Sequence, residues 1–305
     1  MTSRRQTVSY LKQRFAEVGM TLQARHGQNF LIDLNLLGLL AEKANVGPND
    51  VVLEVGTGTG ALTEMIARHA AAVVTVEIDP RLHQLAYEEL IDFDNVIMLQ
   101  QDALANKNTL DPLVLEALNA KLAEAHQRQF KLVANLPFSV ATPVISNLLD
   151  LDRPPVEMTI TIQKELAERI VAKPSTKDYG ALSIWVQSQC QAELVRLIPP
   201  QAFWPRPKVT SAIVQIRLDP ELRGRIDDRA FFHSFARGLF RHRRKFLRSV
   251  LPSVYKGRLE KSDVDALLAR HDLATSTRAE ELDVATVLRL AEAVHQLLAR
   301  DATRP

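Results

Sequence analysis

The sequence contains only one cysteine, Cys190, among its 305 residues. A single thiol excludes a disulfide framework and a zinc site built from several thiolates. The eight histidines show none of the short spacings that metal sites use, so we expect no metal centre.

Long apolar runs are also missing. No uninterrupted stretch approaches the roughly 18 apolar residues of a membrane-spanning helix, and no early segment has the charged and then apolar pattern of a signal peptide. We therefore expect a cytoplasmic protein with no membrane segment, and we expect it to be a monomer. The hydrophobic content of 46% is enough for a full core, and the length allows one large or two ordinary domains.

One stretch lacks acidic residues. Residues 229–259 hold nine Lys or Arg and no Asp or Glu, so their formal charge is +9. Because the net charge of the whole chain is +2, the rest of the chain carries −7. A mildly acidic body with one concentrated cationic segment predicts a polyanionic partner.

Another absence is the G-x-G-x-x-G fingerprint of dinucleotide-binding sheets. Instead, an apolar strand over 51–55 leads into Gly56, Gly58 and Gly60, after which a helical pattern begins. A strand, a glycine turn and a helix form the front half of a βαβ unit. The tight glycine spacing, together with the acid Glu54 inside the strand, favours a nucleoside bound by its sugar and amino-acid tail over a pyrophosphate.

Up to residue 218, short apolar strands alternate with helical patterns. This alternation predicts an α/β fold: a Rossmann-like, doubly wound and mostly parallel seven-stranded sheet. A Pro-containing loop rather than a helix joins the last two strands, so we expect them to form an antiparallel hairpin at the edge of the sheet. The strands are predicted at 51–55, 73–79, 96–99, 130–134, 157–163, 193–198 and 211–218.

Helical patterns cover most of the remaining sequence. From residue 219 onward no strand pattern survives, which predicts a domain boundary and a small, all-helical C-terminal domain. Residues 104–129 also have helical spacing and make a connection longer than the sheet needs. The other helices are predicted at 1–17, 33–43, 61–68, 80–90, 142–149, 164–173 and 179–189, and within 228–301.

Distinctive groups stand at the ends of the first four strands, namely Gly56, Glu77, Asp102 and Asn135. Ligands of open parallel sheets lie at the carboxyl ends of the strands, so these groups should face one crevice. Glu77 is placed to reach ribose hydroxyls, and Asp102 can accept a hydrogen bond from a purine amino group. Two acids suit a cationic ligand such as a sulfonium, which points to S-adenosyl-L-methionine as cofactor.

The tetrapeptide 135–138, Asn-Leu-Pro-Phe, predicts the reaction chemistry. The Asn135 amide oxygen and a nearby carbonyl, made rigid by Pro137, can accept both hydrogens of an exocyclic amine. This arrangement turns the nitrogen lone pair toward an electrophile without a general base. Phe138 offers a ring on which an extruded base can stack.

The cationic segment predicts an RNA-binding helix face. Four of its arginines step by four, three and four residues, which would align them along one side of a helix. Such a stripe would contact phosphates rather than read bases. The predicted RNA-binding residues are Arg237, Arg241, Arg243, Arg244, Lys245 and Arg248.

Each of these features has a plainer interpretation on its own. The glycines could form an ordinary turn, Glu77 could be a solvated strand-end acid, and Asp102 could cap a helix. Residues 135–138 could be a simple exit from a strand, and a basic run is usually a solvated helix face. Their combination favours a site.

Taken in order, the motifs resemble those of the small-subunit (16S) ribosomal RNA adenine N6,N6-dimethyltransferases. The resemblance extends from about Arg25 to about Val250 and depends on all nine motifs occurring in sequence. They are GQNFL (27–31), LEVGTGTGALT (53–63), VEID (76–79), QDAL (101–104), NLPF (135–138), QKELAERI (163–170), YGALS (179–183), PPQAFWPRPKVTSAIV (199–214) and RRKFLR (243–248).

The resemblance implies a methyltransferase domain over 1–218 and a helical RNA-binding domain over 219–305. It implies four methyl transfers to N6 of two adjacent adenosines near the 3′ end of small-subunit rRNA, within a pre-30S particle. Phe138 stands where many members have Tyr, so the ring is kept and a hydroxyl is lost. Asn135, Pro137 and Phe138 would surround the target adenine. The implied cofactor contacts are Asn29, Leu31, Gly56, Gly58, Glu77, Asp102, Ala103 and Asn135.

Other functions stay open at this point. A large-subunit (23S) rRNA adenine methyltransferase of the macrolide-resistance type is one alternative, although the long C-terminal segment and RRKFLR favour the small-subunit enzymes. An RNA-binding ribosome-assembly factor that needs no turnover is another. A nicotinamide-dependent dehydrogenase is disfavoured because its glycine fingerprint is missing.

Overall fold

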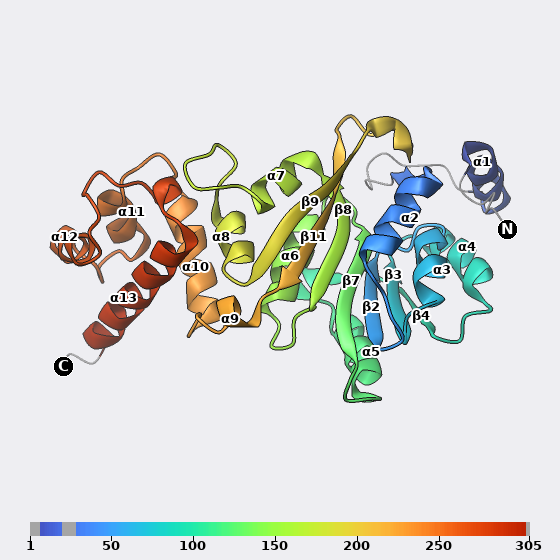
Figure 1. Cartoon of the computed structure of the whole chain (residues 1–305), viewed down its shortest axis with the longest axis horizontal. Helices are drawn as coiled ribbons and strands as arrows, with labels where there is room; N and C mark the ends of the chain where they lie inside the picture. The colour runs from blue at the N-terminus through green and yellow to red at the C-terminus, as the bar shows by residue number, and fades with distance from the viewer. Residues whose placement is uncertain (1–6, 20–28, 303–305) are drawn as a thin grey trace. The chain divides into compact units, whose positions relative to one another are not determined.

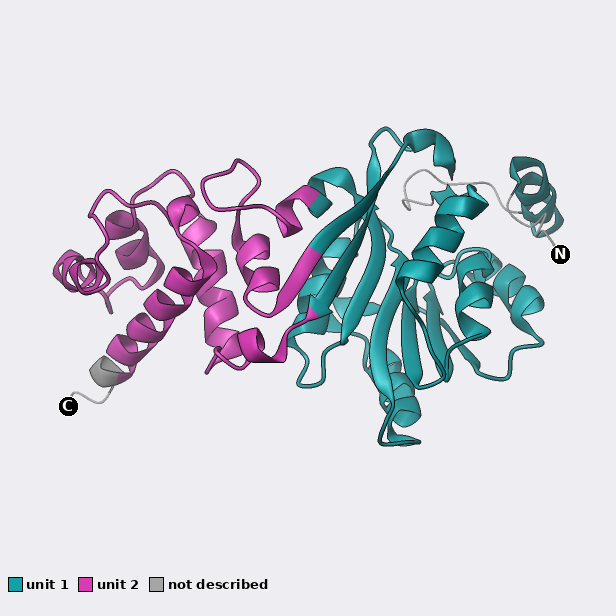
Figure 2. Ribbon diagram, viewed as in Figure 1, with its two compact units in different colours: residues 1–167, 193–217 teal, residues 168–192, 218–305 magenta. Residues whose placement is uncertain are grey.

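The computed structural model describes residues 7–19 and 29–302 (Figure 1). The start of the predicted helix over 1–17, and Gly27 and Gln28 of the GQNFL motif, lie outside the described residues. The chain divides into two compact units, residues 1–167 with 193–217 and residues 168–192 with 218–305 (Figure 2). These units differ from the predicted ranges, 1–218 and 219–305, because 168–192 belong to the second unit.

The seven-stranded sheet confirms the predicted α/β architecture. Its strand order is β4-β3-β2-β7-β8-β11-β9. The first five strands in this order pair with one another in parallel, and β11 pairs with β8 in antiparallel register. The strands are β2 (Asp50–Val55), β3 (Ala72–Glu77), β4 (Val96–Gln100), β7 (Gln129–Asn135), β8 (Glu157–Gln163), β9 (Cys190–Ile198) and β11 (Ser211–Leu218).

The strand order reverses direction between β2 and β7, which places a crevice at their carboxyl ends. Every residue of β2 and β3 is buried, so both faces of the sheet are covered there. On one face, Val52 and Val73 pack in a core cluster with Leu40 of α2 and Ile66 of α3. This packing makes a rigid base for whatever the strand ends present.

The helices of the first unit begin at residues that the sequence marks. Asp33, Asp79 and Asp111 accept hydrogen bonds from the first backbone N–H groups of α2, α4 and α5, respectively. Proline at the first position suits the starts of α4 and α5. The helices are α2 (Leu34–Lys43), α3 (Ala61–Ala67), α4 (Pro80–Leu90), α5 (Pro112–Ala123), α6 (Ala141–Asp150) and α7 (Lys164–Ile170), with a 3₁₀ turn at Pro200–Ala202.

Two short strand pairs were not expected. Residues predicted to be helical instead form a hairpin of β5 (Leu104–Asn106) and β6 (Thr109–Leu110). Here Asn106 accepts hydrogen bonds from the Asn108 N–H and the Thr109 hydroxyl, which stabilises a turn. The second pair joins β1 (Phe30–Leu31) to β10 (Phe203–Trp204) in antiparallel register.

The N-terminal helix α1 (Val8–Glu17) buries Leu11 and Phe15 in a separate cluster. The Phe15 ring lies 5.3 Å from the Phe30 ring, centroid to centroid, so the helix packs on the residue that begins β1. Arg14 pairs with Glu88 on α4 at 2.8 Å. The segment from Phe30 is therefore supported by α1 and by β10.

The second unit is helical. The buried Tyr179 hydroxyl donates to the Leu282 carbonyl at 2.9 Å, and Trp185 stacks on His233 at 4.3 Å between ring centroids. These contacts join 168–192 to the C-terminal helices. The helices are α8 (Ala181–Gln187), α9 (Pro220–Arg223), α10 (Arg229–Phe240), α11 (Leu247–Val254), α12 (Lys261–Arg270) and α13 (Val284–Ala302), with a 3₁₀ turn at Ala279–Glu281.

Candidate functional site

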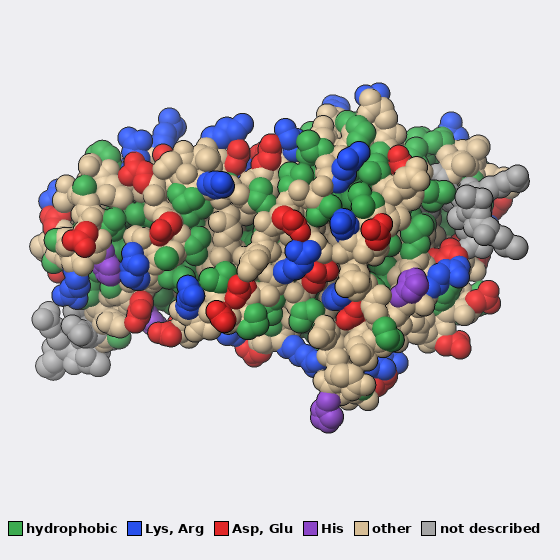
Figure 3. Space-filling view, viewed as in Figure 1, with side chains coloured by type: hydrophobic (Ala, Val, Ile, Leu, Met, Phe, Trp, Pro, Cys, Tyr) green, Lys and Arg blue, Asp and Glu red, His purple; other side chains and the backbone are tan. Residues whose placement is uncertain are grey.

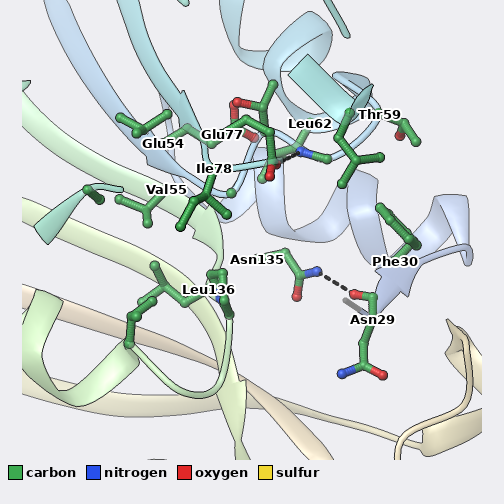
Figure 4. A pocket seen from close by; sticks show the side chains of 18 of the residues that line it. Asn29, Phe30, Glu54, Val55, Thr59, Leu62, Glu77, Ile78, Asn135 and Leu136 are labelled. Carbon is green, nitrogen blue, oxygen red and sulfur yellow. Dashed lines mark hydrogen bonds between the residues drawn. The ribbon is translucent and has the colours of Figure 1, made fainter. Parts of the chain in front are cut away.

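A cavity of about 280 Å³ opens at the carboxyl ends of β2, β3 and β7 (Figure 4). The residue that follows β4 and the segment that forms β1 complete its wall. Each residue predicted to bind the cofactor or to carry the chemistry lines this one cavity. These residues are Asn29, Leu31, Gly56, Gly58, Glu77, Asp102, Ala103, Asn135, Pro137 and Phe138.

The glycine turn requires glycine at two positions. Gly56 has φ +88°, and a Cβ there would lie 3.2 Å from the Pro137 ring. Gly58 has φ +58°, and a Cβ there would lie 3.5 Å from the Phe30 ring. A side chain would strain the backbone at either position, and at Gly56 it would also press on Pro137, so the bare backbone leaves room for a ligand.

Glu77 ends β3 and holds the glycine turn in place. One of its carboxylate oxygens accepts from the Gly58 N–H at 2.9 Å (Figure 4). The other accepts from the Asp79 N–H at 3.0 Å. Burial raises the pKa of Glu77, while the two N–H groups act to lower it. The side chain is 6% exposed, so a ligand that reached it would meet an oriented, largely dehydrated carboxyl group.

Glu54 is a second buried acid in the cavity wall, next to the last residue of β2. Its Oε2 accepts from the Thr63 hydroxyl at 2.5 Å and from the Thr75 hydroxyl at 2.7 Å. The Thr57 hydroxyl lies 2.6 Å from the Thr75 hydroxyl, which extends this network to the glycine turn. Burial, with a smaller contribution from the nearby Glu77, raises the pKa of Glu54 to about 8, although the hydrogen bonds from Thr63 and Thr75 act to lower it. Glu54 is therefore mainly neutral at pH 7.

Glu54→Gln is expected to stabilise the protein at pH 8 but not at pH 5. The native state keeps the Glu54 proton up to a pKa of about 8, whereas the ordinary pKa is 4.5. Between these values the native state binds the extra proton, so stability falls by about 1.4 kcal/mol per pH unit as the pH rises. Thermal unfolding of both proteins between pH 5 and pH 8 measures how the difference in their stability changes with pH. Stabilisation by Gln that is equal at both pH values would contradict a buried neutral acid, and exposed Glu116→Gln is the control.

Asn135 ends β7 and has a fixed amide. Its Nδ2 donates to the Asn29 carbonyl at 3.1 Å, so Oδ1 is the end that remains to accept from a ligand (Figure 4). The backbone that follows is also held, because the Leu136 N–H donates to the Thr161 carbonyl and the Val140 N–H donates to the Pro137 carbonyl, both at 3.1 Å. The site thus presents an amide oxygen on a rigid turn.

Asp102 and Ala103 follow β4 at the same edge. The Asp102 Oδ1 accepts from the Leu104 N–H at 2.9 Å, and the Ala103 carbonyl accepts from the Asp111 N–H at 2.9 Å. Asp111 also binds the Gln101 side chain at 2.8 Å. The start of α5 therefore positions the residues that were predicted to contact a purine.

Several cavity residues were not predicted. Ile78 directly follows Glu77, lines the cavity and is 59% exposed, which is unusual for an isoleucine next to a buried strand. Phe30 and Thr57 also line it. The signal for Ile78 was present in the sequence, as an apolar residue between the strand-end acid and the helix cap Asp79. Its position suits contact with a flat apolar face of a ligand.

The predicted basic helix face is wrong. α10 ends at Phe240 and α11 begins at Leu247, so turns separate the four arginines that were expected to share one helix face. The break has a physical cause. The Leu247 N–H donates to the Thr277 carbonyl at 2.9 Å, and Phe246 forms an isolated β-bridge with Arg278, which draws the chain away from a helix.

Two of the six predicted RNA-binding residues have carboxylate partners. Arg248 makes a two-pronged contact with Asp265 at 2.6 and 2.8 Å. Arg243 donates to Glu280 at 2.5 Å and to backbone carbonyls of 176–177. Within the described residues, no carboxylate pairs with the other four, which are exposed: Arg237, Arg241, Arg244 and Lys245.

Four of the six predicted RNA-binding residues line one surface hollow of about 690 Å³, namely Arg241, Arg243, Arg244 and Lys245. Arg278 adds a further cation to the same hollow. The accumulation of positive charge keeps an RNA-binding role as a prediction, now for a turn rather than a helix face.

Two further findings concern the described ranges alone. They contain no group of three His, Cys, Asp or Glu side chains arranged to hold a metal ion. None of their helices has both the length and the apolar character needed to cross a bilayer.

Comparison with known proteins adds an independent result. Residues 19–296 match the family model described as ribosomal RNA adenine dimethylase. A relative from Lactiplantibacillus plantarum is 40% identical over 281 residues, covering 91% of this chain and 92% of its own length. One from Geobacillus kaustophilus is 37% identical over 292 residues, covering 95% and 96%, respectively. Both are named ribosomal RNA small subunit methyltransferase A.

Solved structures show the same fold. A dimethyladenosine transferase from Plasmodium falciparum gives a TM-score of 0.71 at 22% identity, covering 86% of this chain and 96% of that one. The 23S rRNA methyltransferase ErmE gives 0.60 at 24% identity, covering 88% and 100%. Their likeness concerns the arrangement of strands and helices.

Proposed function

Because the chain belongs to the ribosomal RNA adenine dimethylase family, we propose that it dimethylates N6 of two adjacent adenosines near the 3′ end of small-subunit (16S) rRNA. The methyl donor is S-adenosyl-L-methionine, and the substrate is a pre-30S particle in the cytoplasm. The protein acts as a monomer. The observation that carries the proposal is the single cavity that gathers every predicted cofactor and catalytic residue.

The cavity residues fit this donor. Glu77 would accept from the ribose hydroxyls, Ile78 would cover one face of the purine, and Asp102 would accept from its amino group. The glycine turn leaves space for the ligand beside the backbone. When bound, the donor supplies an electrophilic methyl group on a positively charged sulfur, and the acidic wall favours that charge.

Asn135 would orient the target amine. Its Nδ2 is occupied by the Asn29 carbonyl, which directs Oδ1 to accept one amine hydrogen. The Pro137 carbonyl already accepts from Val140, so we assign the second acceptor to the Leu136 carbonyl. With both hydrogens held, the nitrogen lone pair faces the donor, and the rate arises mainly from orientation and exclusion of water. Phe138, half-buried at the cavity, would stack on the adenine.

The small-subunit substrate is favoured over the large-subunit one by the sequence comparison. Relatives at 37–40% identity over at least 90% of the chain carry the small-subunit name. The large-subunit enzyme ErmE shares 24% identity.

Transfer of a tritiated methyl group to isolated ribosomal subunits tests the proposal. We expect label on small subunits that lack the modification, and none on mature small subunits or on large subunits. Label that appears only on large-subunit RNA would reject the substrate. Tight binding to small subunits with no transfer would reject the enzymatic function in favour of an assembly factor.

A further inference from the structure

The proline-rich loop over 205–210 begins beside the cavity wall. It follows β10, whose residues Trp204 and Phe203 pair with Phe30 and Leu31 of β1. Phe30 and Leu31 both line the cavity. Neighbouring strands lie about 4.8 Å apart, so the loop leaves the sheet pair within reach of a ligand bound in the cavity.

This loop is fixed at both ends. At its start, the Trp204 ring stacks on the Phe15 ring with centroids 5.8 Å apart. At its end, the Thr210 carbonyl accepts from the Lys164 N–H at 2.9 Å, and β11 follows immediately. Pro205 and Pro207 restrict the backbone between these anchors. Side chains on the loop are therefore presented from a preorganised position.

Two of these side chains are cations, Arg206 and Lys208, and both are exposed. In the part of the chain that the structure describes, neither pairs with a carboxylate. The sequence from 194 to 218 contains four Lys or Arg and no Asp or Glu. Figure 3 shows Lys and Arg side chains along the edge of the molecule where the loop lies. An anion is thus favoured beside a cavity whose own wall is acidic.

We propose that Arg206 and Lys208 bind backbone phosphates of the RNA strand that carries the target adenosine. This assignment rests on the proposed function, because the RNA strand that lies beside the loop is the one whose target adenine occupies the cavity. The acidic wall attracts the cationic donor, and the loop attracts the polyanionic substrate, so the two ligands meet opposite charges at neighbouring places. The contacts would position the strand without reading its sequence.

The double variant Arg206→Gln/Lys208→Gln tests the loop. We expect its affinity for small subunits to fall about tenfold, and the salt dependence of log K to become shallower by about 1.5, as for the loss of two phosphate contacts. Affinity for S-adenosyl-L-methionine should stay unchanged, which also reports that the variant folds. Unchanged RNA affinity and unchanged salt dependence would overturn the assignment.

The matched control removes two exposed cations from the end of the sheet at which β7 and β8 begin, away from the cavity. Lys43 lies at the end of α2, next to Ala44, whose carbonyl contacts Lys131 near the start of β7. Arg153 lies shortly before β8 begins. Lys43→Gln/Arg153→Gln makes the same change in net charge, so an equal loss of affinity in this variant would mean that only net charge matters and would overturn the assignment.

Acetylation footprinting gives a readout that needs no turnover. A bound small subunit that lacks the modification should protect Lys208 from acetylation and leave Lys43 reactive. Cross-links from Lys208 to a ribosomal protein, with none to rRNA, would assign the loop to that protein instead. The footprint and the salt dependence are measured without methyl transfer, so they test the loop even if no transfer is detected. Failure of the wild-type protein to transfer methyl groups would instead count against the proposed function.

Discussion

Asn135→Ala is expected to lower the rate of methyl transfer by about 10³ while complexes with RNA and with the methyl donor still form. The change removes the amide oxygen that would hold one amine hydrogen, so the target nitrogen is no longer directed at the donor. It also frees the Asn29 carbonyl, to which Asn135 donates at 3.1 Å. Single-turnover transfer at saturating RNA and donor separates the chemical step from binding.

Two further variants distinguish orientation from simple loss of packing. Asn135→Asp keeps an oxygen acceptor but cannot donate to Asn29, so it should lose much of the activity and bind the donor normally. Ser139→Ala alters an exposed residue that lines the same cavity and should transfer at nearly the wild-type rate. An Asn135→Ala protein that keeps a tenth of the wild-type rate would contradict the proposed role.

The parallel core could be predicted because its sequence signal is local. Strands such as β2 and β8 are continuous apolar or alternating runs, and they form where expected. The helix starts at Asp33 and Asp79 are equally local, since one carboxylate satisfies the first N–H groups of its own helix. The cavity follows from these elements, because a parallel sheet brings its strand ends to one edge.

The elements that were missed depend on contacts between distant residues. Phe30 and Trp204 pair across more than half of the chain, and two-residue strands carry no periodic signal of their own. The prediction of a basic helix face failed for a related reason, because arginines spaced three and four residues apart can lie in a turn as well as along a helix. The contacts of Phe246 and Leu247 with 277–278 hold the chain in an extended path just before α11, and they join residues far apart in the sequence. The ion pairs that occupy Arg243 and Arg248 are of the same long-range kind.

Glu77→Ala is expected to weaken binding of S-adenosyl-L-methionine about 100-fold. The buried carboxyl group would accept from two ribose hydroxyls, and hydrogen bonds to a charged group contribute about 1.5 kcal/mol or more each. The substitution also removes the acceptor for the Gly58 N–H, so part of the loss arises from a less ordered glycine turn. Calorimetric titration of the donor measures the effect, and thermal unfolding checks that the variant is folded.

The same titration with S-adenosyl-L-homocysteine, the product that lacks the methyl group and its positive charge, separates two roles of Glu77. If Glu77 holds the sugar, the variant should lose affinity for donor and product by the same factor, since both carry the same ribose. If Glu77 acts mainly by attracting the sulfonium, only the charged donor should lose affinity. Exposed Glu116→Ala controls for a change in net charge and should alter neither. A loss confined to the donor would therefore reject Glu77 as the ribose ligand while leaving the cavity as the donor site.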